Sequence, residues 1–350
     1  MSDNKFTILH PIPNYKQVNT RKGVSQYASA LAAKGHDVEL VIYDSKNSNT
    51  EQIDIEGVEI RRIAADGIWR IFSVIPVLLQ CKSDVFLTQF FGKKDFIWAP
   101  ICWLCGIKYT IMFDYTPKGK EISPLLYYLI KLKLIYLSIF VNTFFAKTGR
   151  SRNELCSICP SIESQTELLS SGVGDIHFQS KDRRSRKTIM YAGRLIDDKN
   201  VGLLVEAFNQ LKDQYEDWVL EIAGDGPQSY NIANTDRIEY RGFLEENELL
   251  ALYARADVFC LPSLHESFSN VLIEAAAAET AIVSTEVGVA PDLLDKTGVL
   301  VDKNNIDSLK DGLEVYMVSP ERADQDGQVL RKEAEKYRLS NVVVSLEELV

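Results

Sequence analysis

Short apolar segments alternate with helix-forming segments along most of the chain, and this alternation restricts the fold more than any other feature of the sequence. Segments rich in β-branched and aromatic residues are typical of buried strands. In the first half we expect six strands, at residues 6–10, 38–43, 59–63, 84–88, 109–113 and 144–147, with 164–169 as a candidate last strand. In the second half we expect strands at residues 188–192, 218–223, 238–241, 256–260, 281–284 and 298–301. Strands that alternate with helices pair in parallel, so we predict an α/β protein with two doubly wound sheets.

The segments between these strands have the composition of helices. We expect helices from about residue 24 to 34, over 69–81, 99–105, 122–140, 201–212 and 245–255, and from Asn270 onward.

Length and composition fit a two-domain globular protein. A chain of 350 residues is long for one hydrophobic core. The polar, basic stretch Gln179–Lys187 is the candidate connector, which places the first domain at residues 1–178. The chain is 46% apolar and 25% charged, as is usual for soluble proteins. Its net charge of −10 argues against binding to nucleic acid.

The loop before the helix at Asn270 has the features of an anion site. Ser267 and Ser269 are both good N-cap residues, and the sequence after them favours helix. The N–H groups of Phe268, Ser269 and Asn270 would then be free to bind a phosphate.

Two carboxylates flank this expected helix start. Glu266 lies in the loop and Glu274 in the helix, 274 − 266 = 8 positions further on. One nucleotide diphosphate sugar, with hydroxyls at both ends, could contact both side chains. The alternative is that both are solvated charges on an ordinary surface helix.

Further candidate ligand groups follow other strand ends. Gly193, Arg194 and Lys199 come after the strand at 188–192, where the two cations could hold an anion. Gly224 follows the next strand. Because ligands of such sheets bind beyond the carboxyl ends of the strands, we expect these residues to share one crevice with Glu266 and Phe268. In the first half, Gly23 could let the backbone approach a ligand, or could equally be a turn residue.

The stretch Lys93–Arg152 is basic and unusually apolar. It holds ten Lys or Arg and three Asp or Glu, a charge of 10 − 3 = +7. Its segment 122–140 is apolar nearly all round. Such a stretch could lie on an anionic membrane surface. The alternative is a buried helix whose lysines extend to water.

The cysteines offer two C-x-x-C pairs, Cys102/Cys105 and Cys156/Cys159. The first pair lies in an apolar stretch, and the two pairs are far apart. We therefore expect buried thiols rather than a metal site.

Five motifs of the second half recur in a familiar order: Gly193-Arg194-x-x-x-x-Lys199, Ala223-Gly224-Asp225-Gly226-Pro227, Pro262-Ser263-x-x-Glu266-x-Phe268 with Glu274-Ala275, Gly288-Val289-Ala290-Pro291-Asp292 and Gly298-Val299-Leu300-Val301. They resemble the retaining glycosyltransferases with the GT-B fold, family 4 (glycosyl transferases group 1). The resemblance implies two Rossmann-like domains facing across a cleft, with the acceptor bound by residues 1–178 and the nucleotide-sugar donor by 179–335. It also implies a last helix, within 336–350, that crosses back to the first domain, and no bound metal or other cofactor.

The resemblance also implies residue roles. Arg194 and Lys199 would bind the donor diphosphate, Glu274 the ribose hydroxyls and Glu266 the transferred sugar. The remaining donor-binding positions would be Gly23, Gly193, Gly224, Phe268, Ser269 and Asn270. The leaving phosphate oxygen would take the acceptor proton on the same face of the sugar, so the anomeric configuration is kept.

The sequence departs from the family pattern at several positions. Ser267 and Ser269 stand where the family usually has glycines, and Glu279 stands where a glycine usually follows the helix. Phe113-Asp114 replaces a common His-Asp pair, which puts the usual first-domain contact to the sugar in doubt.

We therefore predict a retaining, hexosyltransferase-type enzyme that moves a sugar from UDP or GDP to a glycan or lipid-linked acceptor, with Glu266, Arg194 and Lys199 as its catalytic residues. We expect a cytoplasmic protein, peripheral on the inner face of the membrane if Lys93–Arg152 binds lipid. Two alternatives stay open: an inactive nucleotide-sugar-binding scaffold subunit, and a GT-B enzyme that epimerises or hydrolyses nucleotide sugars.

Overall fold

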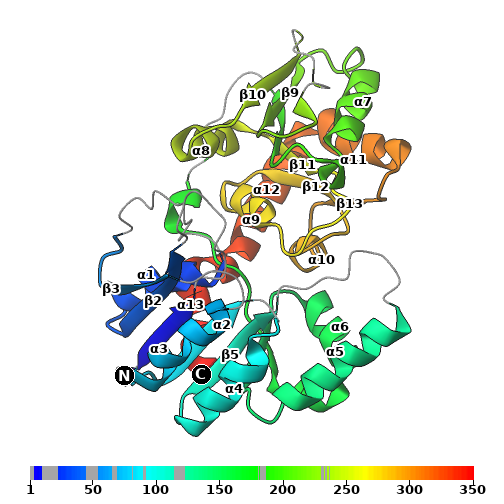
Figure 1. Ribbon diagram of the computed structural model, residues 1–350. Coiled ribbons are helices and arrows are strands. Elements are labelled where there is room, and N and C mark those ends of the chain that lie inside the picture. Colours follow the sequence, from blue (N-terminus) through cyan, green and yellow to red (C-terminus); the bar gives the residue numbers. More distant parts are fainter. Residues whose placement is uncertain are drawn as a thin grey trace. The chain divides into compact units, whose positions relative to one another are not determined.

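The computed structural model describes residues 4–9, 23–44, 54–64, 69–80, 82–89, 92–113, 123–179, 181, 187–229, 232, 235 and 237–350. The chain forms two compact units, Met1–Gly172 with Leu339–Val350, and Val173–Arg338. Each unit is a parallel sheet flanked by helices (Figure 1). The chain passes between the units at residues 172/173 and 338/339, whereas the sequence-based boundaries are 178/179 and 335/336.

The first unit contains a sheet of seven parallel strands, which includes the candidate strand near residue 166. Their order is β3 (Val58–Ala64), β2 (Asp37–Asp44), β1 (Lys5–Leu9), β4 (Val85–Gln89), β5 (Lys108–Phe113), β6 (Thr143–Ala146) and β7 (Thr166–Leu168). The doubly wound prediction is confirmed for this unit.

Alternate residues of the strands pack against two different helix layers, as the two-residue period of a strand requires. On β4, Phe86 belongs to the core shared with α3 (Ile75–Gln80), α4 (Asp95–Leu104), α5 (Pro124–Leu137) and α6 (Gly149–Ile158). Its neighbours Val85 and Leu87 belong to the core shared with α1 (Gln26–Ala33) and α13 (Leu339–Leu349). The first unit is therefore a three-layer structure.

The helix predictions at 69–81 and 99–105 are wrong in part, and each segment contains a proline. The first is two helices, α2 (Trp69–Ser73) and α3. In one continuous helix the ring of Pro76 would clash with the carbonyl of Phe72, which explains the division; residue 81 lies outside the described residues. The second, α4, begins four residues earlier and contains Pro100. Pro100 has no N–H for the carbonyl of Phe96, which instead accepts a hydrogen bond from the Tyr136 hydroxyl at 3.1 Å.

Helix α6 is absent from the sequence-based predictions. Its amino end is fixed by a reciprocal capping box between Thr148 and Ser151. The Thr-x-x-Ser spacing in a polar segment is the signal that could have located it.

Helix α13 returns to the first unit and packs on α1. Val342, Val343 and Leu346 are buried in the core that α1 shares. Glu347 accepts hydrogen bonds from Lys34 at 2.5 Å and from His36 at 2.6 Å, just after α1 ends. No helix among the described residues is long and apolar enough to cross a membrane.

The second unit contains six parallel strands around one continuous core. Their order is β10 (Ile238–Gly242), β9 (Trp218–Ala223), β8 (Lys187–Ala192), β11 (Val258–Leu261), β12 (Ala281–Thr285) and β13 (Val299–Val301). The flanking helices are α7 (Val201–Leu211), α8 (Glu246–Arg255), α9 (Asn270–Ala277), α10 (Ala290–Leu293), α11 (Ile306–Val318) and α12 (Pro320–Ala334). Strand order reverses between β8 and β11, and the carboxyl ends of strands at such a switch point are where α/β sheets bind ligands.

A strained residue follows α9. Glu279 has φ +61°, a left-handed conformation that glycine adopts without cost. Its side chain pairs with Arg331 at 3.2 Å, and its carbonyl packs so closely on α12 that a Cβ on Gly327 would lie 2.1 Å from the oxygen. The departure from the family pattern at this position therefore has a conformational cost.

We expect Glu279→Gly to be more stable than Glu279→Ala by about 1 kcal/mol, because both lose the Arg331 pair and only glycine relieves the left-handed strain. Urea unfolding of the two variants measures this difference. Equal unfolding midpoints would show that Glu279 is not strained.

Candidate active site

Two glycines bring the ends of β8 and β9 together. A Cβ on Gly224, where φ is +131°, would lie 1.8 Å from the carbonyl oxygen of Gly193. The N–H of Gly193 donates to the carbonyl of Ala223 at 3.1 Å. Only glycine at position 224 permits this approach of two backbones.

The loop after β8 carries the two predicted cations. Its backbone is held by a hydrogen bond from Leu195 N–H to the Asp225 carbonyl at 2.9 Å, and by the Tyr191 hydroxyl, which donates to the Arg194 carbonyl at 3.0 Å. Burial raises the pKa of Tyr191, so its hydroxyl stays protonated and donates. Arg194 itself is exposed, and no carboxylate among the described residues pairs with it.

Lys199 and Glu266 form an ion pair with an Nζ–Oε1 distance of 2.5 Å. The pair is largely buried, with 17% of the Lys199 side chain and 9% of the Glu266 side chain exposed. The Ser263 hydroxyl donates to the same Glu266 oxygen at 2.8 Å. The two residues that the sequence assigns to diphosphate and sugar therefore lie in contact, at the carboxyl ends of β8 and β11.

The loop before α9 has free N–H groups, as expected for an anion site. Among the described residues no acceptor binds the backbone N–H of Phe268, Ser269 or Asn270. The helix begins at Asn270 as predicted, but the prediction that a serine side chain caps it is wrong. Ser269 has φ +74°, and its hydroxyl oxygen is buried with no hydrogen-bond partner among the described residues. Glycine adopts such a left-handed conformation without cost, which agrees with the glycine that the resemblance leads us to expect here.

The side chain of Phe268 takes no part in this anion site. Its ring is buried against Tyr337, at 6.0 Å between centroids. Its carbonyl accepts the Val289 N–H at 2.8 Å, and a Cβ on Gly288 would lie 2.4 Å from that oxygen. The loop after β12 thereby fixes the loop after β11.

Glu274 lies one helical turn further along α9. Its carboxylate accepts a hydrogen bond from the Tyr253 hydroxyl of α8 at 3.1 Å. Burial, followed by the charge of Glu274, raises the pKa of Tyr253 well above its usual value, so this hydroxyl remains a donor. The contact fixes the Glu274 carboxylate.

The sequence analysis missed the residues that hold the predicted ones in place, namely Tyr191, Tyr253, Ser263 and Gly288. Ser263 and Gly288 lie within the recognised motifs. The two tyrosines belong to a strand and a helix with no local signal of function.

Gly23, the remaining predicted donor residue, lies in the first unit, at the start of the short turn Gly23–Ser25 before α1. The adjacent Val24 N–H donates to the Gln89 side chain at 3.2 Å, at the end of β4. Asp114 lies outside the described residues.

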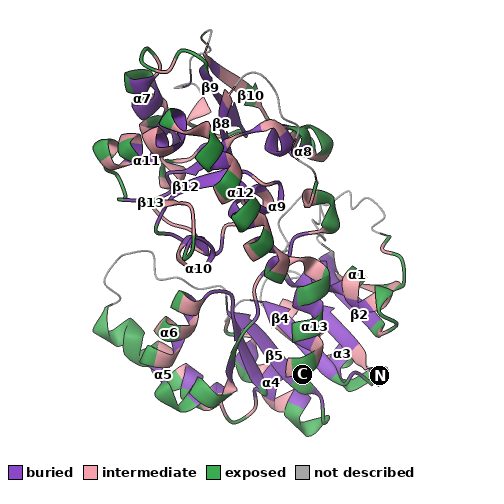
Figure 2. Ribbon diagram, turned by 180° about the vertical axis from the view of Figure 1, so that it is seen from behind, coloured by how far each residue is buried: buried purple, intermediate pink, exposed green. Residues whose placement is uncertain are grey.

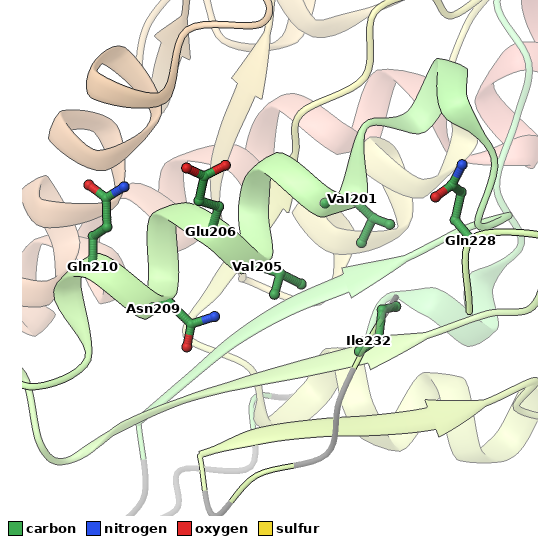
Figure 3. Close-up of a pocket in the computed structure, with 8 residues that line it drawn as sticks. Val201, Val205, Glu206, Asn209, Gln210, Gln228 and Ile232 are labelled. Carbon is green, nitrogen blue, oxygen red and sulfur yellow. The ribbon is translucent and has the colours of Figure 1, made fainter. Parts of the chain in front are cut away.

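A pocket of about 320 Å³ lies beside α7 (Figure 3). Val201, Val205 and Ile232 form its apolar part, and Gln228 borders it. It contains none of the predicted site residues, so we do not assign the donor to it.

The cysteines that the structure describes are unbonded thiols, and Cys102 and Cys159 are buried. Within the described ranges no group of three or more His, Cys, Asp or Glu could hold a metal ion.

The two parallel sheets and the loop cluster at the β8/β11 switch point define a protein of the GT-B class. Two solved structures show the same fold across 99% of this chain and 98% of theirs. A glycosyltransferase from Rickettsia africae has a TM-score of 0.77 at 16% identity, and HepE of Anabaena, in complex with UDP and glucose, has 0.72 at 13%.

Residues 173–341, which span the whole second unit and the first three residues of α13, match the family model "Glycosyl transferases group 1". An uncharacterized glycosyltransferase of Methanocaldococcus jannaschii is 28% identical over 335 residues, 82% of each chain. A 2-deoxystreptamine N-acetyl-D-glucosaminyltransferase of Niallia circulans is 31% identical over 144 residues, which span 38% of this chain and 36% of that protein.

Proposed function

We propose that the chain is a retaining glycosyltransferase that takes a sugar from UDP or GDP and gives it to a glycan or lipid-linked acceptor without a metal ion. The observation that carries this proposal is the composition of one loop cluster. Arg194, the Lys199–Glu266 pair and three free N–H groups lie at the switch point where such sheets bind ligands. The presence of UDP in the HepE structure supports a nucleoside diphosphate donor.

The charges of the cluster suit a departing diphosphate. Arg194 offers a planar fork of donors and Lys199 a point charge, while the amino end of α9 adds free N–H groups and a positive dipole. Fixed donors of this kind stabilise the charge that grows on the leaving phosphate as the bond from the anomeric carbon breaks.

The proposed step balances without a protein nucleophile. The anomeric carbon loses its bond to the diphosphate and gains one to the acceptor oxygen on the same face. The acceptor proton passes to the leaving phosphate oxygen. Glu266 would orient the sugar hydroxyls, and Glu274 the ribose hydroxyls.

The test begins with ligand binding. At a hundredfold excess over Kd, UDP or GDP should stabilise the protein by about 2.7 kcal/mol and raise its melting temperature. Adenosine diphosphate serves as the control for non-specific binding of a diphosphate. If neither UDP nor GDP raises the melting temperature, the donor assignment is wrong.

Product analysis separates the proposal from the two alternatives. A screen of nucleotide sugars with a simple sugar acceptor should yield a glycoside of unchanged anomeric configuration. If the wild type binds the nucleotide sugar but shows no more turnover than the Glu274→Ala variant, the protein is a scaffold subunit. Donor consumption that is independent of any acceptor would indicate a hydrolase or epimerase.

A further inference from the structure

One face of the first unit is both apolar and exposed. Of the 21 large apolar side chains that are exposed in the described residues, 14 lie between Trp69 and Ile139. They belong to α2, α3, α4, α5 and the residues just after α5. Trp69 is 70% exposed, Trp103 60%, Leu104 75% and Leu125 69%. This concentration exceeds the scattered apolar side chains of an ordinary surface.

The side chains form one surface because their helices pack side by side over the same face of the sheet. The rings of Phe96 in α4 and Tyr136 in α5 lie 5.1 Å apart, and those of Trp103 and Phe140 lie 6.0 Å apart. The Trp98 indole N–H of α4 donates to a carbonyl of α2 at 2.7 Å. We call this surface, on α2 to α5, the apolar face.

Most apolar side chains of helix α5 are exposed, and Figure 2 shows most of this helix in the colour of exposed residues. Only Leu134 and Leu137 of this helix are buried. Lys133 points inward and pairs with buried Asp95 at 3.3 Å, and its burial lowers its pKa. The interpretation of this segment as a buried helix is therefore wrong, and of its two lysines only Lys131 is partly exposed to water, whereas Lys133 is directed inward.

The charges at the apolar face have one sign. Asp95 is the only acidic residue in α2 to α5, and it is fully buried. Lys93 is exposed just before α4, and Lys131 is partly exposed on α5. Trp and Tyr side chains with adjacent lysines suit the interface of an anionic bilayer. In a symmetric dimer this face would meet a copy of itself, and the described helices α2 to α5 carry no exposed carboxylate that could pair with either lysine.

We propose that the apolar face docks the protein on an anionic phospholipid membrane. The proposal goes beyond the transferase function and does not depend on it, because vesicle binding requires no donor. Lys133 lies outside the binding surface, since it is committed to Asp95.

The test is co-sedimentation of the full chain with vesicles. Phosphatidylglycerol–phosphatidylcholine vesicles should bind the protein, and pure phosphatidylcholine should bind it far less. Lys93→Ala with Lys131→Ala should weaken binding at least about tenfold, as expected for two lysines near a charged surface. Leu104→Glu with Leu125→Glu should abolish sedimentation with either vesicle.

The matched control is Val318→Glu with Leu300→Glu, which changes exposed side chains of the second unit, 68% and 46% exposed. It should bind vesicles like the wild type, and circular dichroism should show that all variants are folded. Failure of the wild type to bind anionic vesicles would overturn the proposal. The proposal would also be overturned if sedimentation equilibrium showed a dimer without lipid and only the variant Leu104→Glu with Leu125→Glu dissociated it. The apolar face would then be a protein interface.

Discussion

Lys199→Ala should lower kcat for sugar transfer by about 10²–10³-fold while the protein stays folded. Loss of one fixed donor to a developing anionic charge typically has this effect. In the free protein Lys199 is paired with Glu266, so the variant also leaves a nearly buried carboxylate without its cation. That carboxylate would repel the donor diphosphate. Steady-state kinetics with saturating donor measures the loss in kcat.

A double variant separates the two causes. UDP and GDP lack the transferred sugar that Glu266 would contact, so Glu266→Gln can be combined with Lys199→Ala, and the binding of UDP or GDP can be measured by calorimetry. If repulsion by Glu266 accounts for the weaker binding, the double variant should bind as tightly as the wild type. If Lys199 itself holds the diphosphate, binding should stay weak. Lys199 lies just before helix α7, and Lys212 lies just after it. Lys212→Ala is therefore the matched control and should leave both kcat and binding unchanged.

Gly224→Ala should destabilise the second unit by about 3 kcal/mol or more, because overpacking and left-handed strain act together. The new Cβ would lie 1.8 Å from a backbone oxygen, so the loops after β8 and β9 must separate. Separation of these loops would displace Arg194 and should also abolish donor binding. Urea unfolding followed by tryptophan fluorescence gives the change in stability.

Gly242→Ala is the control for strain without crowding. Gly242 has φ +65°, and a Cβ there would meet no atom within 4 Å. Its substitution should cost only about 1 kcal/mol. Equal losses in the two variants would mean that the close approach of Gly224 to Gly193 has no energetic weight.

The sequence predicted most of the fold. Strands such as β9 and β8 are buried runs of β-branched and aromatic residues, and their predicted ends agree with the structure within a residue. Two errors have local causes: Pro76 divides α2 from α3, and the polar helix α6 shows no apolar period. The helices α11 and α12 were also missed, although α11 has buried apolar residues at helical spacing.

For the candidate site, the sequence alone determined which residues follow strand ends and where α9 begins, because motif spacing and helix propensity are local. Their roles in catalysis stay predictions. Only the tertiary structure decided that Lys199 pairs with Glu266, 67 positions away, and that Tyr253 holds Glu274. The Lys199–Glu266 contact arises because β8 and β11 are neighbours in the sheet, so two loops remote in the chain end at one place. The Tyr253–Glu274 contact joins α8 and α9, the helices that precede and follow β11. Only the structure likewise shows that Ser269 is left-handed and that its side chain does not cap α9.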